Sequence, residues 1–113
     1  MPFDPQPDLT DEEAEQRVAE AIADNDVVLF MKGTPLMPQC GYSDRALGLI
    51  KQYREDFETV NVLDALDAYR AALQPKSGRE TIPQIFVEGE FVGGSDILAE
   101  LDERGELEAT LQA

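Results

Sequence analysis

One cysteine carries most of the chemistry available to this chain. Cys40 is the single cysteine in 113 residues, and histidine is absent. Pro38 and Gly41 flank Cys40, a pattern typical of a junction between a loop and a helix. Only a thiolate is a good nucleophile or metal ligand, and the unpaired N–H groups of a helix start favour that anion. We therefore expect a reactive thiol at this position. The alternative is that Cys40 is an ordinary small core residue.

Two regular elements are expected to position Cys40. The apolar run at residues 27–31 predicts a buried strand, and a Gly/Pro loop that begins at Lys32 follows it. After Cys40, apolar residues at near-helical spacing predict an amphipathic helix of about three turns; they are Ala46, Leu47, Leu49, Ile50 and Tyr53. The thiol would then stand at a helix start, with Lys32 as a nearby positive charge.

Length and charge limit the function classes. A chain of 113 residues fits one domain, and it has neither an 18-residue apolar stretch nor a signal-like N-terminus. We expect a cytoplasmic protein that binds no membrane. Twenty-four acidic residues against nine basic ones give a net charge of −15, which argues against binding to nucleic acid. Because the acids are spread along the chain, they favour a host with high internal salt over an acidic partner-binding face.

The first part of the chain divides at a helix start. Residues 1–9 contain three prolines and predict an irregular lead-in, so that the domain would occupy residues 10–113. Thr10 and Glu13 have the spacing of a capping box, which predicts a first helix that ends near residues 24–26.

The second half predicts alternating elements. Apolar residues within 57–62 indicate a second strand, and Asp64 is expected to cap a helix that ends near residues 77–78. A strand, helix and strand in succession imply a parallel pair. Two apolar runs, 84–87 and 91–92, surround a glycine turn and predict an antiparallel hairpin.

The last helix is expected to begin at the segment Gly93-Gly94-Ser95-Asp96 and to run to about residue 104, with a short extension at 107–111. Paired glycines before a Ser/Asp cap expose N–H groups that suit a carboxylate. The alternative is a plain turn and helix cap.

The segment MKGTPLMPQCGYSDRALGLI, residues 31–50, resembles the active-site segment of the monothiol glutaredoxins, in which Lys-Gly-Thr-Pro precedes Cys-Gly-Phe-Ser. This chain has Cys-Gly-Tyr-Ser, and Ser43 replaces the second cysteine of dithiol relatives, so that no internal disulfide can close. The resemblance covers roughly residues 12–108. It implies an α/β, thioredoxin-like fold, with a four-stranded mixed sheet and helices on both faces.

The resemblance also implies a glutathione site. Lys32 and Arg70 would hold the glycine carboxylate, the backbone of Ile82 would pair with the cysteinyl unit, and Ser95 with Asp96 would bind the γ-glutamyl end. Pro83 would follow a cis bond. Cys40 would be both the catalytic residue and the metal ligand, and the residues implied for glutathione are Lys32, Gly41, Tyr42, Arg70, Thr81, Ile82, Pro83, Gly94, Ser95 and Asp96.

Three functions fit these residues. A [2Fe-2S] cluster needs four thiolates or equivalents, and one chain supplies one. Two chains with two molecules of glutathione, or of a related small thiol, would complete the set as a cluster-bridged homodimer that passes the cluster to apo iron-sulfur acceptor proteins. The second function is glutathione-dependent thiol–disulfide exchange through Cys40 alone. It gains weight because Ser77-Gly78-Arg79-Glu80 resembles the dithiol glutaredoxins. The third is a non-catalytic adaptor.

Overall fold

The computed structural model describes residues 9–112. The lead-in expected at residues 1–9 therefore lies, except for Leu9, outside the described residues. The elements, in chain order, are α1 (Asp11–Asp24), β1 (Val27–Met31), α2 (Gly41–Lys51), β2 (Glu58–Asn61), a 3₁₀ helix η1 (Val62–Ala65), α3 (Leu66–Ser77), β3 (Gln84–Val87), β4 (Glu90–Gly93), α4 (Ser95–Glu103) and α5 (Leu107–Leu111).

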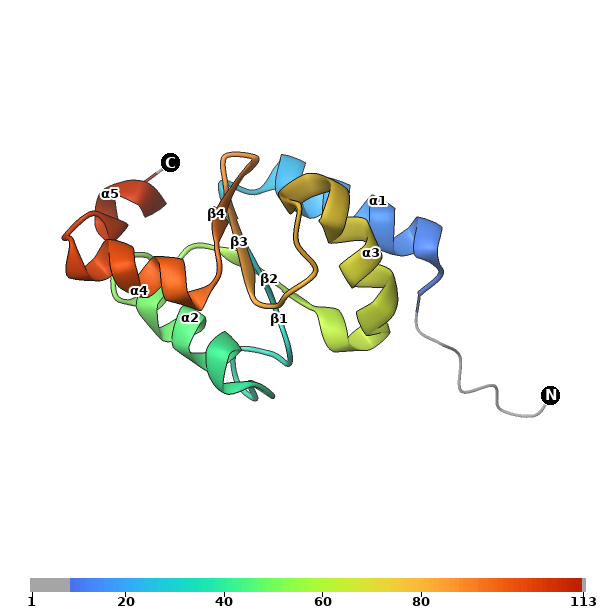
Figure 1. Cartoon of the computed structure of the whole chain (residues 1–113), viewed down its shortest axis with the longest axis horizontal. Coiled ribbons are helices and arrows are strands. Elements are labelled where there is room, and N and C mark those ends of the chain that lie inside the picture. Colours follow the sequence, from blue (N-terminus) through green and yellow to red (C-terminus); the bar gives the residue numbers. More distant parts are fainter. Residues whose placement is uncertain (1–8, 113) are drawn as a thin grey trace.

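The four strands form one mixed sheet in the order β2-β1-β3-β4. β1 runs parallel to β2 and antiparallel to β3, and β3 pairs with β4 as the predicted hairpin. Helices α1 and α3 cover one face of the sheet, and α2 and α4 cover the other (Figure 1). This arrangement confirms the fold class expected from the sequence.

β1 is buried on both faces, which explains its unbroken apolar sequence. Val28 and Phe30 point into the core beneath α1 and α3, whereas Val27, Leu29 and Met31 point into the core beneath α2 and α4. Each side chain of this kind stabilises the fold by about 1.5–3 kcal/mol when fully buried. β1 thus packs in both cores, and the loop between β1 and α2 begins at the end of this buried strand.

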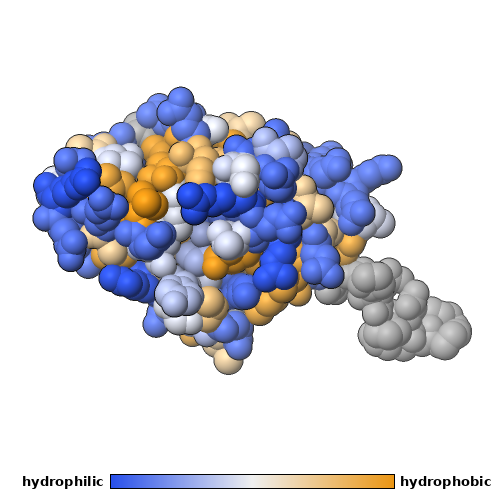
Figure 2. Space-filling view, viewed as in Figure 1, coloured by the Kyte–Doolittle hydropathy of each residue, from blue (hydrophilic) through white to orange (hydrophobic). Residues whose placement is uncertain are grey.

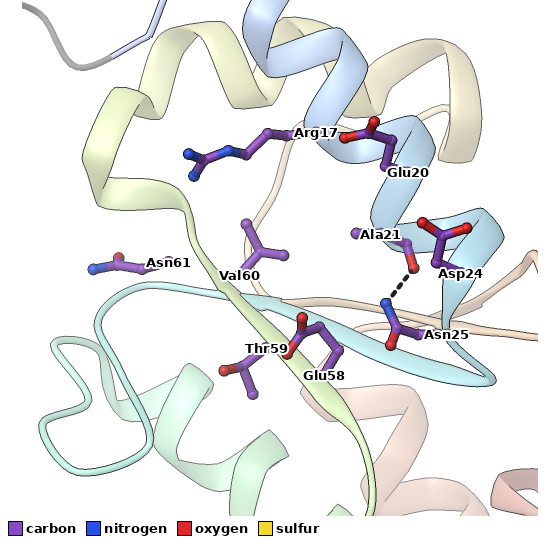
Figure 3. Close-up of a pocket in the computed structure, with 9 residues that line it drawn as sticks. All are labelled: Arg17, Glu20, Ala21, Asp24, Asn25, Glu58, Thr59, Val60 and Asn61. Carbon is purple, nitrogen blue, oxygen red and sulfur yellow. Dashed lines mark hydrogen bonds between the residues drawn. The ribbon is translucent and has the colours of Figure 1, made fainter.

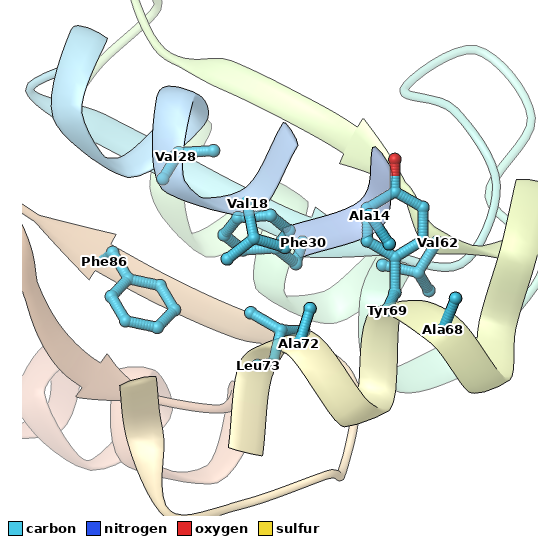
Figure 4. Packing of buried hydrophobic residues seen from close by; sticks show 10 residues of the cluster. All are labelled: Ala14, Val18, Val28, Phe30, Val62, Ala68, Tyr69, Ala72, Leu73 and Phe86. Atoms are coloured by element: carbon cyan, nitrogen blue, oxygen red, sulfur yellow. The ribbon is translucent and has the colours of Figure 1, made fainter. Parts of the chain in front are cut away.

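The core beneath α1 and α3 is organised around aromatic rings (Figure 4). The rings of Phe30 and Phe86 meet edge to face at 5.7 Å, and Phe91 lies 5.5 Å from Phe86. Tyr69 of α3 fills the same core, and its hydroxyl has no hydrogen-bond partner among the described residues. Apart from that Tyr69 hydroxyl, the side chains that form this core are apolar.

α1 starts with the predicted capping box. The Thr10 hydroxyl accepts a hydrogen bond from the Glu13 amide at 3.1 Å, and the Thr10 amide donates to the Glu13 carboxylate at 2.9 Å. Hydrogen bonds from the backbone and side chain of Thr10 lower the pKa of the Glu13 carboxyl, against a smaller opposing effect of burial, and the charge of Arg17 adds the least in the lowering direction. Two amides of the first turn are thereby satisfied within the chain.

The expected cap at Asp64 is wrong. The strand β2 ends at Asn61, one residue earlier than expected, and its side-chain oxygen accepts from the Leu63 amide at 3.0 Å to start the 3₁₀ helix. Asp64 lies inside η1, and α3 begins at Leu66 without a side-chain cap. An Asx turn directly after the strand therefore took precedence over a cap three residues later. The predicted end of α3 at Gly78, which adopts a left-handed conformation, is confirmed.

Hydrophilic side chains cover most of the face seen in Figure 2, with smaller hydrophobic areas between them. This distribution agrees with the net charge of −15. Among residues 9–112, no helix has the length and hydropathy needed to span a bilayer.

Candidate functional site

The loop between β1 and α2 folds back on itself and presents Cys40 at the N-cap of α2. The Gln39 amide donates to the Lys32 carbonyl at 2.9 Å, and Gly33 forms a bridge with Pro38. Gly33 has a φ of +94°, and a Cβ built there would lie 2.5 Å from the Met37 carbonyl oxygen. Only glycine fits this conformation, so Gly33 is a geometric requirement of the turn.

Cys40 is partly exposed, and its thiol is activated by its surroundings. Burial opposes ionisation, but the amides of Ser43 and Tyr42, the Ser43 hydroxyl and the charge of Lys32 together outweigh it and lower the pKa of the thiol. Among the described residues, the Cys40 side chain makes no capping hydrogen bond to its own helix. The first-turn amides therefore remain available to a thiolate.

Ser43 is a functional residue whose role the sequence left unassigned. It is fully buried, and its hydroxyl oxygen accepts a hydrogen bond from the Lys32 amide at 3.0 Å. The same hydroxyl favours the ionised form of Cys40. Ser43 thus ties the end of β1 to the first turn of α2, in the position where dithiol relatives carry a second sulfur.

A groove of about 320 Å³ lies beside the start of α2. Its wall on one side is the segment before β3, where the bond between Ile82 and Pro83 is cis. Its wall on the other side is the start of α4. The residues that line the groove are Tyr42, Thr81, Ile82, Pro83, Gly94, Ser95 and Asp96, and all seven belong to the predicted set.

The start of α4 carries no side-chain cap. Gly94 is the N-cap residue, and Ser95, expected as part of a Ser/Asp cap, is instead the first helical residue and is only 6% exposed. A Cβ at Gly94 would lie 3.1 Å from the Pro83 carbonyl oxygen, so the absence of a side chain there lets the two walls approach. Gly94, Ser95 and Asp96 line the groove at this uncapped helix start, a combination of backbone donors and a carboxylate that suits the charged groups of an amino acid.

The remaining predicted residues do not line this groove in the part of the chain that the structure describes. Cys40 and Gly41 directly precede Tyr42, which lines the groove. Lys32 lies close enough to Cys40 to affect its ionisation. Arg70 on α3 makes a loose ion pair with Asp67, with 3.9 Å between the charged atoms.

A larger cavity, of about 500 Å³, lies elsewhere, between α1 and β2 (Figure 3). It contains no sulfur, and its side chains are polar or small. Its lining residues are Arg17, Glu20, Ala21, Asp24, Asn25, Glu58, Thr59, Val60 and Asn61. We assign the chemistry to the smaller groove because Tyr42, which lines it, lies in the first turn of the helix whose N-cap residue is Cys40.

Two side-chain amides, of Asn61 and Gln84, hold the loops that form the site through hydrogen bonds. Neither residue was selected from the sequence. Asn61 accepts from the Gly33 amide at 2.9 Å as well as from Leu63, which fixes the start of the cysteine loop. Gln84 donates to the carbonyls of Arg79 and Thr81, on the opposite side of the site. An Asn after a strand and a Gln after a Pro are common patterns, so neither residue type signalled its role.

The donor set of one chain is too small to hold a metal cluster alone. Within residues 9–112, no group of three or more His, Cys, Asp or Glu side chains converges as metal ligands would. A cluster at Cys40 would need thiolates from outside the chain, and the accessible position of Cys40 beside a peptide-sized groove fits that need.

Comparisons with known proteins identify the family of this chain. The glutaredoxin family model matches residues 27–92. An uncharacterized monothiol glutaredoxin of Synechocystis sp. is 43% identical over 88% of this chain and 92% of its own length. A probable monothiol glutaredoxin of Legionella pneumophila is 48% identical over 75% of this chain and 94% of its own length.

Solved structures give the same result. The solution structure of reduced apo GrxS14 from poplar has a TM-score of 0.76, with 36% identity over 89% of this chain and 92% of that one. A complex of buckwheat glutaredoxin with glutathione has a TM-score of 0.76, with 30% identity over 89% of each chain. Sequence, fold and the single cysteine lead to one conclusion: the chain belongs to the glutaredoxin family, in its monothiol branch.

Proposed function

We propose that this glutaredoxin binds a [2Fe-2S] cluster together with glutathione, as a cluster-bridged dimer, and transfers the cluster to apo iron-sulfur acceptor proteins. The observation that carries the proposal is a single activated, accessible thiol beside a groove, with no further metal donors gathered near it in residues 9–112. Two chains and two glutathione thiolates supply the four ligands that the cluster needs.

The groove suits glutathione in shape and charge. Ile82 would offer its backbone to the cysteinyl unit, as one strand does to another. The α4 start with Ser95 and Asp96 would hold the γ-glutamyl end, while Lys32 and Arg70 would hold the glycine carboxylate. The buckwheat relative, 30% identical, has been solved as a glutathione complex, which supports this assignment.

The surface around Cys40 supports a dimer. Three large apolar side chains are exposed there, Leu36 at 95%, Met37 at 67% and Tyr42 at 67%. Leu36 and Met37 belong to the cysteine loop, and Tyr42 lies in the first turn of α2. A second chain bound across a shared cluster would cover these side chains and remove their apolar surface from water.

Anaerobic reconstitution with iron, sulfide and glutathione tests the proposal. We expect a coloured dimer with visible charge-transfer absorption, which forms only when glutathione is present. The Cys40→Ser protein should stay colourless and monomeric. The control Asp102→Asn, near the end of α4, keeps the thiol and the groove and should reconstitute. A coloured protein formed equally well without glutathione would contradict the proposed ligand set.

The lowered pKa of Cys40 favours glutathione-dependent thiol–disulfide exchange as a second candidate. The Cys40 thiolate would attack the glutathione sulfur of a mixed disulfide, and the substrate would leave as a thiolate. A second glutathione would then attack the Cys40 disulfide, releasing glutathione disulfide and the free thiolate. A colourless protein that is active in a deglutathionylation assay would favour this function. A protein inactive in both assays would favour the adaptor.

We further propose a cytoplasmic setting with high internal salt, without nucleic acid partners. The net charge of −15 and the single, unpaired cysteine support this setting. Because salt screens like charges, the free energy of unfolding should increase with potassium chloride up to about 1 M. Chemical denaturation at several salt concentrations measures this dependence, and equal stability without salt would remove the salt-rich host from the proposal.

A further inference from the structure

One wall of the groove is held almost entirely by side chains. Outside the helices and strands, no backbone-to-backbone hydrogen bond among residues 9–112 involves residues 79–83. This irregular segment nevertheless contains Ile82, whose backbone must keep one direction to pair with a bound peptide. Something other than regular structure therefore sets its conformation.

The Gln84 side chain provides the main restraint. Its amide nitrogen donates to the Arg79 carbonyl at 2.9 Å and to the Thr81 carbonyl at 3.0 Å. Both N–H bonds of the amide are thus used, and the two acceptors lie on either side of Glu80. The side chain is only 1% exposed, so water cannot take the place of these contacts.

Gln84 is itself firmly anchored. It is the first residue of β3, and it pairs with Phe30 of the fully buried strand β1. Gln84 and Phe86 lie on the same face of β3, and Phe86 packs in the core beneath α1 and α3. The Gln84 carboxamide therefore fixes the groove segment, residues 79–82, relative to the sheet.

Stability alone does not account for a glutamine here. The Oε1 atom of Gln84 is buried without a hydrogen-bond partner in the described chain. An unpaired buried oxygen disfavours the folded state, and an apolar residue would avoid that penalty. The two donated hydrogen bonds are the compensating feature.

We propose that Gln84 is a positioning residue for glutathione: it holds residues 79–82 so that the Ile82 backbone is aligned with the bound tripeptide. This inference rests on the proposed glutathione site. It predicts that Gln84 controls affinity for glutathione and leaves the intrinsic reactivity of Cys40 unchanged, because the groups that activate the thiol belong to β1 and α2.

The test uses the full-length reduced protein and glutathione itself. Gln84→Met keeps the length of the side chain and removes both donors. We expect the dissociation constant for glutathione, from NMR titration, to rise about tenfold. The alkylation rate of Cys40 by iodoacetamide should stay within about twofold, since it depends on the thiolate alone. Gln74→Met, the same change on the exposed side of α3, should alter neither value.

The outcomes separate this inference from the proposed function. If the wild-type protein shows no glutathione-dependent shifts, the proposed function fails and this inference fails with it. If wild type binds and Gln84→Met binds equally well, only the inference is overturned. A parallel loss of affinity and alkylation rate would also overturn it, because that pattern indicates general distortion.

Ser77→Ala keeps the test decisive if Gln84→Met does not fold. The Ser77 hydroxyl accepts from the Arg79 amide and lies 3.1 Å from the Arg79 carbonyl oxygen, so it restrains the same segment from the end of α3. We expect a smaller loss of glutathione affinity, about threefold, with unchanged alkylation. Unchanged affinity in this variant would contradict a segment whose alignment depends on side-chain hydrogen bonds.

Discussion

The start of α1 differs from the starts of α2 and α4. Thr10 and Glu13 close the first turn of α1 with two reciprocal hydrogen bonds. The N-cap residues Cys40 and Gly94 make no such side-chain bond to their helices. Within residues 9–112, the starts of α2 and α4 contribute residues to the groove, whereas the start of α1 does not. The starts of α3 and α5 in the described chain also lack a side-chain cap but contribute no residue to the groove.

This difference shows how the same backbone feature can serve stability or binding. The first N–H groups of any helix lack partners within the helix. A capping box satisfies them internally and stabilises the folded chain. An open start instead keeps its donors for an anion, which is the Cys40 thiolate at α2 and, in the proposed complex, a carboxylate at α4. The predictions below test this division, starting with the largest expected effect.

The largest effect is expected at α2. Ser43→Ala removes the hydroxyl that favours the thiolate and holds the Lys32 amide, so the pKa of Cys40 should rise. The rate of alkylation at neutral pH should fall severalfold, because less thiolate is present. Alkylation followed against pH measures the change, with Ser77→Ala as a serine control outside the thiol site. A pH profile that superimposes on wild type would show that the hydroxyl does not tune the thiol.

A smaller effect is expected at α4. Asp96→Asn removes a carboxylate that would accept from the ammonium group of glutathione, and the dissociation constant should rise only about twofold to threefold, because Asp96 is exposed and water screens the pair. Calorimetric or NMR titration gives this value. Alkylation of Cys40 should not change, since Asp96 does not contribute to its ionisation. Asp102→Asn, near the end of the same helix, is the matched control.

At α1 the effect should concern stability alone. Thr10→Ala opens the capping box and should lower the free energy of unfolding by about 1 kcal/mol. Denaturant titration measures this loss. Glutathione affinity and the alkylation rate should equal those of wild type. A change in either would mean that the closed helix start also influences the site, and the division between stability and binding would not hold.

The smallest effects come from pH, in two separate windows. Cys40 has a lowered pKa in the folded chain, so the unfolded chain binds more protons between the folded and unfolded values. Stability should rise with pH across that window, and the gain should disappear as pH falls through the folded pKa. Glu13, also lowered, should act likewise in the acid range. Cys40→Ser should remove only the neutral-to-alkaline gain in denaturation experiments, and Glu13→Gln only the acidic one.

The sequence predicted the strands and helices well where local signals agreed with packing. The apolar run of β1, the capping box of α1 and the glycine turn of the hairpin each had one reasonable structural interpretation. Asp64 shows the limit, because two cap-forming side chains compete near the end of β2 and only the backbone path decides between them.

The candidate site was predictable where motifs mark it, and less so where contacts are distant in sequence. Seven residues implied by the family resemblance line one groove. The supporting hydrogen bonds of Asn61 and Gln84 depend on where neighbouring segments pass, which a single sequence does not encode in any short pattern. The exact N-cap of α4, Gly94 in place of Ser95, likewise follows from the close approach of Pro83.

The thiol and most of its groove come from opposite halves of the chain and meet through the pairing of β1 with β3. A backbone cut at the exposed Gly78 would therefore leave Cys40 on one fragment and the Pro83 and Asp96 walls on the other. Neither fragment would contain a complete binding site. If the two fragments reassemble, glutathione binding should recover with them. Glutathione binding would therefore be a measure of how far β1 and β3 have paired again.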